Sequence, residues 1–268
     1  MSIFKPNILA GKKAFVTGGG SGICKGIASA LLAHGAAVTI SSRSRERLDQ
    51  AAAELRRDTG GDCFSYAADV RDPDQVGAAL DQAIDSMGGL DIVVNGAAGN
   101  FLAPAAQLSP KGFKTVMEID AQGTYNVSHL AFQKALKDGG GSILNISATL
   151  HYAGTPFQAH AGSAKAAIDA MTRHLAVEWG GCGIRVNAIA PGPIDDTVGM
   201  SKLAPGGVKK KMEKLIPLGR FGRIDEIADA AVFLSSPAAA YVTGAILVVD
   251  GGAWMTFGQI FKDAFGGS

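Results

Sequence analysis

Short apolar runs alternate with amphipathic stretches along most of the chain. The apolar runs are strand-sized and nearly continuous, which is typical of strands buried on both faces of a parallel sheet. Seven strands are predicted, at Lys13–Thr17, Ala37–Ser41, Cys63–Ala67, Leu90–Asn95, Gly141–Ser147, Ile184–Ile189 and Ala245–Asp250. Helices are predicted between them, at Ile23–Leu32, Arg45–Arg57, Asp74–Met87, Ser109–Leu136, Gln158–Trp179 and Asp225–Leu234. This alternation predicts an α/β fold, a doubly wound seven-stranded parallel sheet with helices on both faces.

No linker or repeat interrupts the pattern, so residues 1–268 are predicted to form a single domain. The stretch 191–219 breaks the alternation with four prolines and the run Lys209–Lys211, and we expect a flap containing a short helix there. The tail at about 255–268 has apolar residues at helical spacing. We expect it to pack against a neighbouring subunit, and covering a substrate site is the alternative. Its apolar residues are Phe257, Ile260, Phe261 and Phe265.

Composition and charge exclude several classes of protein. The chain has 268 residues, 47% hydrophobic and 18% charged, which excludes a disordered chain. The net charge of +1 favours neither nucleic acid nor an anionic membrane as a partner. The three cysteines are scattered, lack metal-ligand spacing and fit a reducing compartment. We see no signal peptide and no peroxisomal address at Gly266–Ser268, so a soluble cytoplasmic protein is expected.

A glycine-rich segment, Thr17–Ile23 (TGGGSGI), joins the first predicted strand to the first helix. Glycines there let backbone N–H groups approach a pyrophosphate, and the helix N-terminus favours its charge, as in a Rossmann dinucleotide site. Ser42 and Arg43 follow the second strand, where an acidic residue would bind the ribose of NAD. Hydroxyl and guanidinium groups suit a 2′-phosphate, so NADP(H) is the predicted cofactor. The alternative is a solvated start of the next helix.

These segments resemble the short-chain dehydrogenase/reductase family, together with Asp69-Val70, Asn95–Ala98, Asn145–Ser147, Lys165 and Pro191–Ile194. The resemblance implies that Asp69 binds the adenine, that Asn95 starts a loop shaping the cofactor site, and that Lys165 holds the nicotinamide ribose. The segment 191–197 would hold the nicotinamide amide. The expected cofactor-binding residues are Gly18, Gly20, Ser21, Gly22, Ile23, Ser42, Arg43, Asp69, Val70, Asn95, Gly96, Ala97, Lys165, Pro191, Gly192, Ile194 and Thr197.

The chain departs from the family at the residues that usually carry catalysis. Ala161 stands where the family has its tyrosine, four residues before Lys165, and Ala148 stands where it has its serine. Asp120 replaces the helix asparagine, and Cys24 replaces the third glycine of the loop. A carbonyl reductase of this family uses the tyrosine to protonate the developing alkoxide, and this chain cannot do so in that way. Either the protein is not catalytic, or its reaction needs no proton at a carbonyl oxygen.

The second alternative fits a branch of the family. The chain resembles 2,4-dienoyl-CoA reductases, particularly the peroxisomal type, which also lack the tyrosine. The similar segments are Asn95–Leu102, Phe113–Asp120, His160–Trp179 and Val249–Trp254. The resemblance implies NADPH-dependent reduction of a 2,4-dienoyl-CoA to a 3-enoyl-CoA in the oxidation of unsaturated fatty acids, and a homotetramer built on the two long helices. The alternatives are another enoyl- or ketoacyl-thioester reductase and a non-catalytic NADP-binding protein.

In that reaction hydride adds to the δ-carbon, charge develops on the thioester oxygen, and a proton goes to the α-carbon. Asp120, Lys165 and Asp169 are the candidate catalytic residues, with the two carboxylates holding a water. Lys165 and Asp169 share one helix face, so an ordinary i,i+4 salt bridge is the alternative. Tyr152 could offer a hydroxyl from the loop after the fifth strand. We expect a polar loop contact for His160.

A CoA thioester needs cations for its phosphates and an apolar passage for its acyl chain. The resemblance places the following residues around it: Arg43, Arg71, Phe101, Ser109 and Lys111. No metal site is expected.

Overall fold

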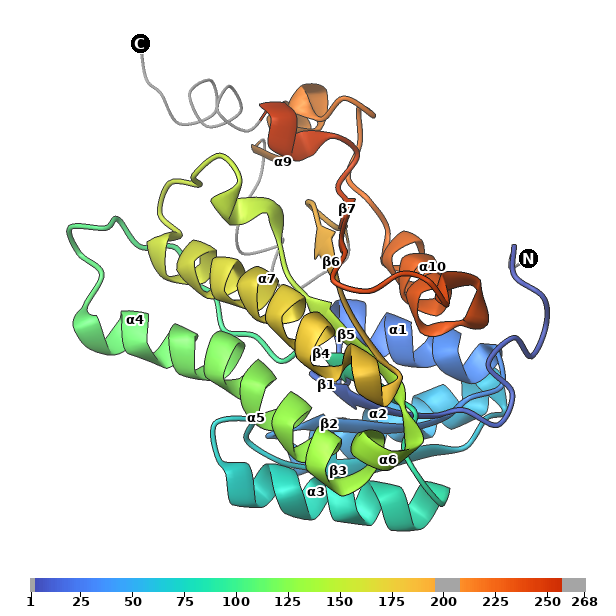
Figure 1. The fold of residues 1–268 in the computed structure, drawn as a ribbon. Helices are drawn as coiled ribbons and strands as arrows, with labels where there is room; N and C mark the ends of the chain where they lie inside the picture. The colour runs from blue at the N-terminus through green and yellow to red at the C-terminus, as the bar shows by residue number, and fades with distance from the viewer. Residues whose placement is uncertain (1–2, 196–207, 257–268) are drawn as a thin grey trace.

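A twisted parallel sheet runs through the centre of the molecule, with helices on both sides (Figure 1). The computed structural model describes residues 3–195 and 208–256. The strands are β1 (Lys13–Thr17), β2 (Ala37–Ser42), β3 (Cys63–Ala67), β4 (Ile92–Asn95), β5 (Gly141–Ile146), β6 (Ile184–Pro191) and β7 (Ile246–Val249). Their order is β3-β2-β1-β4-β5-β6-β7, and every pair is parallel. The predicted fold is confirmed, and the ends of every strand lie within two residues of the prediction.

The helices form two layers, each with its own apolar core. One core joins the sheet to α1 (Gly22–Ala33), α2 (Arg45–Thr59) and α10 (Ile224–Ser235). The other joins it to α3 (Pro73–Met87), the middle of the long helix that follows β4, and α7 (Ala159–Trp179). Adjacent strand residues serve opposite layers: Phe15 lies in the second core and Val16 in the first. Strands flanked in this way are apolar at consecutive positions, which is why the sequence shows runs instead of alternation.

The long helix predicted at Ser109–Leu136 is continuous but contains two π-helical turns. It runs through α4 (Pro110–Met117), a π turn at Glu118–Gln122, α5 (Gly123–Ala131), a π turn at Phe132–Leu136 and the short α6 (Lys137–Gly139). The Ser109 hydroxyl accepts a hydrogen bond from the backbone N–H of Gly112, which caps the N-terminus. Asp120 lies in the first π turn, and π turns within α-helices are frequent at functional sites.

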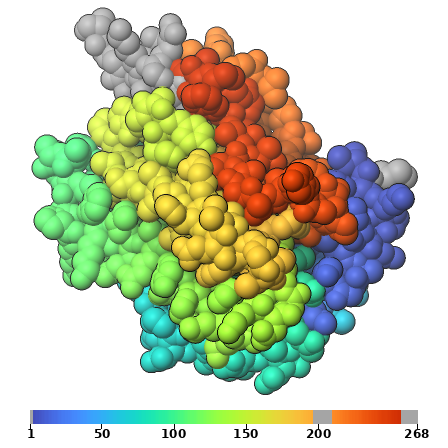
Figure 2. Space-filling model, in the orientation of Figure 1, coloured from blue at the N-terminus to red at the C-terminus, as the bar shows by residue number. Residues whose placement is uncertain are grey.

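The order of the strands creates a crevice at the carboxyl edge of the sheet. The chain steps outward from β1 to β2 and β3, then returns to place β4 on the other side of β1. Ligands of doubly wound sheets bind at such a switch point. In the space-filling view, α7 (yellow) lies between the long light green helix and the red segment near the C-terminus (Figure 2).

Parts of two predicted features lie outside the described residues. Of the flap, the structure describes its beginning and, from residue 208 on, the helix α9 (Val208–Leu215), which is the short helix expected there. Thr197 and the four apolar residues of the tail are not among the described residues. Within residues 3–195 and 208–256, no helix is long and apolar enough to cross a membrane.

Candidate active site

The loop between β1 and α1 is held in a shape that only glycine tolerates well. Gly18 has a φ of +71°, and a Cβ there would lie 2.7 Å from the carbonyl oxygen of Gly96. The hydroxyl of Thr17 accepts hydrogen bonds from the N–H groups of Gly96 and Ala97, at 3.0 and 3.2 Å. These two hydrogen bonds connect the loop after β1 to the loop after β4, at the point where the strand order reverses.

The N-terminus of α1 opens into this crevice without a side-chain cap. Ser21 stands at the N-cap position, but its hydroxyl accepts no hydrogen bond from the first turn. The free N–H groups and the helix dipole make the position suitable for an anion. Together with the glycine loop, this end of the helix fits the pyrophosphate of a dinucleotide.

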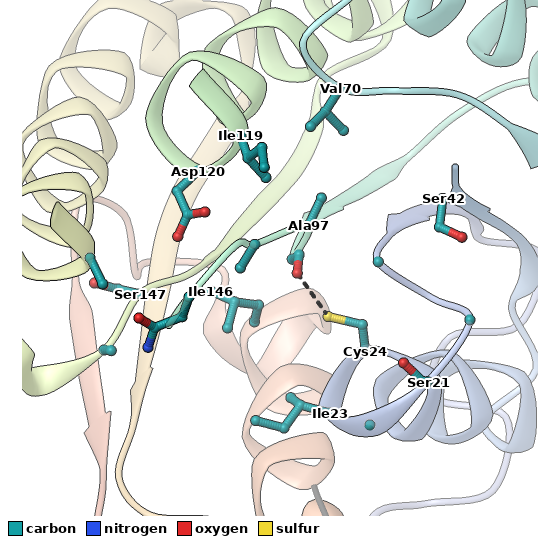
Figure 3. Close-up of a pocket in the computed structure, with 18 of the residues that line it drawn as sticks. Ser21, Ile23, Cys24, Ser42, Val70, Ala97, Ile119, Asp120, Ile146 and Ser147 are labelled. Atoms are coloured by element: carbon teal, nitrogen blue, oxygen red, sulfur yellow. Dashed lines mark hydrogen bonds between the residues drawn. The ribbon is translucent and has the colours of Figure 1, made fainter. Parts of the chain in front are cut away.

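A cavity of about 470 Å³ extends from this loop across the carboxyl ends of the strands (Figure 3). Asp120 and Ser147 lie at one end and Ser42 at the other. Fourteen of the predicted cofactor-binding residues line it: Gly18, Gly20, Ser21, Gly22, Ile23, Ser42, Arg43, Asp69, Val70, Gly96, Ala97, Lys165, Pro191 and Gly192.

The two remaining described members of the predicted set lie elsewhere. Asn95 is 3% exposed, and its side-chain amide donates to the Ser128 hydroxyl and the Asn145 side-chain oxygen at 2.8 and 2.9 Å. It anchors β4 to its neighbours and does not line the cavity. Ile194 lines a separate small cavity and forms a backbone bridge with Gly222.

Arginines surround the end of the cavity where β2 stops. Arg43 and Arg47 both line it, and no acidic side chain follows Ser41 and Ser42. The sequence prediction missed Arg47, although its position four residues after Arg43 in the first turn of α2 was a usable signal.

Asp69 and Arg71 form an ion pair beside this end of the cavity. The Arg71 guanidinium reaches the carboxylate at 2.5 Å, and this hydrogen bond lowers the pKa of Asp69. The same contact raises the pKa of Arg71. Arg71 and Asp69 also line a shallow acidic cavity with Glu118, so Arg71 faces solvent at the rim.

Cys24 fills the position of the missing third glycine. Its thiol lies in the cavity wall, 3.7 Å from the carbonyl oxygen of Gly96. A Cβ at Gly96 would collide with the Cys24 sulfur, so the cysteine is accommodated because the facing residue is glycine. Burial raises the pKa of the Cys24 thiol to about 12, which keeps it protonated.

Lys165 and Asp120 form a buried ion pair at the other end of the cavity. The ammonium nitrogen of Lys165 lies 3.2 Å from Asp120 Oδ2, and their side chains are 10% and 1% exposed. Lys165 also donates to the carbonyl oxygen of Ile146 at 3.0 Å, and Asp120 Oδ1 accepts from the Gly99 N–H at 2.7 Å. An ammonium group has three donors, so one remains for a ligand.

Asp169 is held by other residues than Lys165. Its carboxylate accepts hydrogen bonds from the hydroxyls of Ser147 at 2.5 Å and Tyr152 at 3.4 Å, and His151 Nε2 lies 3.0 Å away. The i,i+4 salt bridge considered as an alternative is not formed, because Asp120 pairs with the lysine. Burial and the Asp169 charge raise the pKa of Tyr152 to about 12.

The positions of the missing tyrosine and serine open onto the cavity. Ala148 and Ala161 both line it, and neither offers a proton. His160, beside Ala161, is fully buried, and its ring lies 4.3 Å from the Phe101 ring between centroids, tilted by 43°. Neither of its ring nitrogens has a hydrogen-bond partner among the described residues, so the polar loop contact expected for it is not found.

The remaining predicted substrate residues lie on the loop and helix beside the cavity. Phe101 is 43% exposed and touches the start of α4, where Ser109 acts as the N-cap. Lys111 is exposed in the first turn. Among the described residues, no group of three His, Cys, Asp or Glu side chains could hold a metal ion.

Comparisons with known proteins show the family of the chain. A family model described as enoyl-(acyl carrier protein) reductase matches residues 18–253. The chain belongs to the short-chain dehydrogenase/reductase family. A citronellol catabolism dehydrogenase of Pseudomonas aeruginosa has a similar structure, with a TM-score of 0.84, 37% identity and coverage of 94% of this chain and 99% of the other.

Within the family, the chain is similar to 2,4-dienoyl-CoA reductases. It is 53% identical to the peroxisomal 2,4-dienoyl-CoA reductase [(3E)-enoyl-CoA-producing] of Danio rerio, over 95% of this chain and 85% of the relative. It is 46% identical to the peroxisomal enzyme of the same description from Saccharomyces cerevisiae, over 94% and 87%. The expected cytoplasmic location is wrong on this finding, because both relatives are named as peroxisomal.

Proposed function

We propose that this chain reduces 2,4-dienoyl-CoA to 3-enoyl-CoA with NADPH, in the oxidation of unsaturated fatty acids. One observation carries the proposal. Ala148 and Ala161 line the cavity where a carbonyl reductase needs hydroxyls, while the buried Lys165–Asp120 pair beside them is intact. A site built in this way suits a reaction that places its proton on carbon. The names of the similar enzymes from Danio rerio and Saccharomyces cerevisiae support it.

NADP(H) is the proposed cofactor, and the chain's own groups supply its recognition. The glycine loop and the uncapped N-terminus of α1 would hold the pyrophosphate. Arg43 and Ser42 would bind the 2′-phosphate, with Arg47 close enough to add charge. Asp69 and Val70 would bind the adenine. When bound, the cofactor supplies the hydride.

Lys165 and Asp120 would position the reacting groups. The free donor of Lys165 would bind the nicotinamide ribose, and its charge would favour the negative charge that develops in the cavity. Asp120 fixes the orientation of the ammonium group, and its hydrogen bond to Gly99 fixes the loop after β4. Asp169 would hold the water or hydroxyl that protonates the α-carbon.

The CoA moiety would lie along the outer rim of the cavity. Arg43 and Arg71 would meet its phosphates, and Phe101, Ser109 and Lys111 would line the passage. The resemblance to the family supports a homotetramer built on the two long helices, on which Tyr125 is 46% and Val177 84% exposed.

The test is loss of NADPH absorbance with purified protein and trans-2,trans-4-decadienoyl-CoA. We expect turnover with the dienoyl thioester and none with a 3-ketoacyl-CoA. Turnover with the ketoacyl thioester alone would favour another thioester reductase. Tight NADPH binding without turnover of either would favour a non-catalytic NADP-binding protein.

A further inference from the structure

A histidine that is not among the residues lining the cavity contacts Asp169. His151 ends the short 3-10 helix Thr149–His151 that follows β5, and its Nε2 lies 3.0 Å from Asp169 Oδ2. The other ring nitrogen, Nδ1, is buried and has no hydrogen-bond partner among the described residues. Asp169 is 3% exposed at its side chain, whereas the His151 side chain is 21% exposed. The histidine is thus the member of the pair that meets solvent.

Ser147 connects the same carboxylate to the cavity. Its hydroxyl donates to Asp169 Oδ1 at 2.5 Å, and the residue lines the cavity beside Ala148 (Figure 3). Three groups therefore form a row from the surface to the cavity: His151, Asp169 and Ser147. Each neighbouring pair is within hydrogen-bonding distance.

We propose that His151, acting through Asp169 and Ser147, is the relay residue that carries a proton from solvent to the cavity once in each turnover. The proposal rests on the proposed dienoyl-CoA reduction, because only a reaction that consumes a proton needs such a supply. His151 is a positioning and relay residue, since it acts through Asp169 and is not among the residues that line the cavity.

The steps balance without any further reactant. Protonated His151 gives its Nε2 proton to Asp169 Oδ2. A half-turn of the carboxyl group, whose torsion is two-fold, brings that proton to Ser147. Ser147 accepts it and releases its own hydroxyl proton into the cavity, to a held water or directly to the α-carbon of the substrate. Because Nδ1 is buried, His151 takes the next proton from solvent at Nε2, when its partly exposed ring turns away from Asp169, and each turnover removes one proton from the medium.

Tyr152 is the other group that could supply the proton, and its environment argues against it. Burial and Asp169 raise its pKa to about 12, and its contact with the carboxylate is the longest, at 3.4 Å. Its ring meets the His151 ring edge-on, with centroids 4.6 Å apart. The other charges that act on Tyr152 are Arg173 and Asp250, which have opposite signs. The long contact and the raised pKa make the Tyr152 phenol the poorer proton source.

The experiment compares His151→Gln with His174→Gln, an exposed histidine on α7 that serves as the control. Glutamine can still donate a hydrogen bond to Asp169 but cannot pass a proton on. We expect kcat with decadienoyl-CoA to fall about a hundredfold, the lower end of the range for acid–base groups. KM and NADPH affinity should change less than about twofold, and the solvent deuterium isotope effect should rise. The control should match the wild type.

A second variant, His151→Ala, leaves room at a partly exposed position for a small buffer acid. Its kcat should rise with imidazole concentration, whereas the wild-type kcat should not. Full activity of His151→Gln, or loss in both variants without imidazole rescue and with weakened binding, would show a structural role and overturn the relay. A wild-type protein that binds NADPH but never turns over the dienoyl thioester would instead overturn the proposed function, and the relay with it.

Discussion

Replacing Asp120 with asparagine removes the charge that faces Lys165 and little else. The amide oxygen can still accept the hydrogen bond from the Gly99 N–H, which is 2.7 Å long in the native site. Lys165 keeps its contact with the Ile146 carbonyl but loses its only ion-pair partner among the described residues. The substitution therefore isolates the contribution of the pair to stability.

The expected loss follows from the burial of both groups. Asp120 is 1% exposed at its side chain and Lys165 10%, with a nitrogen–oxygen distance of 3.2 Å. Removing one partner of a buried pair costs about 3–5 kcal/mol. Because Lys165 lines a cavity that water can enter, we expect the lower value, about 3 kcal/mol. For a chain of this size that lowers the unfolding temperature by roughly 6–12 °C.

The measurement is urea unfolding of Asp120→Asn, Lys165→Met and the double variant, monitored by circular dichroism. The double variant places two neutral groups together, so its loss should be smaller than the sum of the two single losses by a coupling free energy of about 2 kcal/mol. Single losses that add to within about 0.5 kcal/mol would refute the reasoning, because the two charges would then act independently. Turnover should be lost in both single variants while the fold survives.

Three other outcomes follow from the structure. Arg43→Ala should weaken NADPH binding about tenfold or more, since it removes one charged hydrogen bond to the 2′-phosphate, and should leave NADH binding unchanged. A fluorescence titration in which the affinities for NADPH and NADH fall equally would contradict this. The hydrogen bond from Arg220 lowers the pKa of Glu226 from 4.5 to about 2. The stability that this ion pair adds to the fold is therefore complete above pH 4.5 and is lost as the pH falls toward 2. In Glu226→Gln, the urea midpoint should fall less between pH 4.5 and pH 2 than in the wild type. An equal fall in both proteins would argue against the ion pair. Iodoacetamide should label exposed Cys182 and leave buried Cys24, whose pKa is raised to about 12, unlabelled until the protein unfolds; rapid labelling of Cys24 in a mass spectrum would contradict its burial.

The sheet could be predicted because each strand carries its own signal. Parallel strands covered on both faces appear as apolar runs, and the helices between them have their own period. Strand ends were less well defined: Leu90 and Asp91 belong to the predicted strand but lie before the start of β4, and β6 continues two residues beyond the prediction to Pro191. The π turn that contains Asp120 has no signature in the pattern of apolar residues.

The glycine loop and the end of the cavity beside Ser42 and Arg43 could also be predicted, because the residues of each are neighbours in sequence. The partners of Asp169 could not. Spacing left a salt bridge with Lys165, four residues earlier, open as an alternative, but Lys165 reaches across to Asp120 on another helix. Ser147 and His151 meet Asp169 only because the segment that follows β5 packs against α7. Such contacts depend on the tertiary arrangement, which local periodicity does not encode.

The central claim is that this site delivers its proton to carbon and not to a carbonyl oxygen. The most direct test is reduction of trans-2,trans-4-decadienoyl-CoA in D₂O with NADPH labelled by deuterium at the transferred position, followed by NMR of the product. We predict one cofactor-derived deuteron at the δ-carbon, one solvent deuteron at the α-carbon and a double bond between the β- and γ-carbons. A product with its double bond still between the α- and β-carbons, or without a solvent deuteron at the α-carbon, would contradict the account.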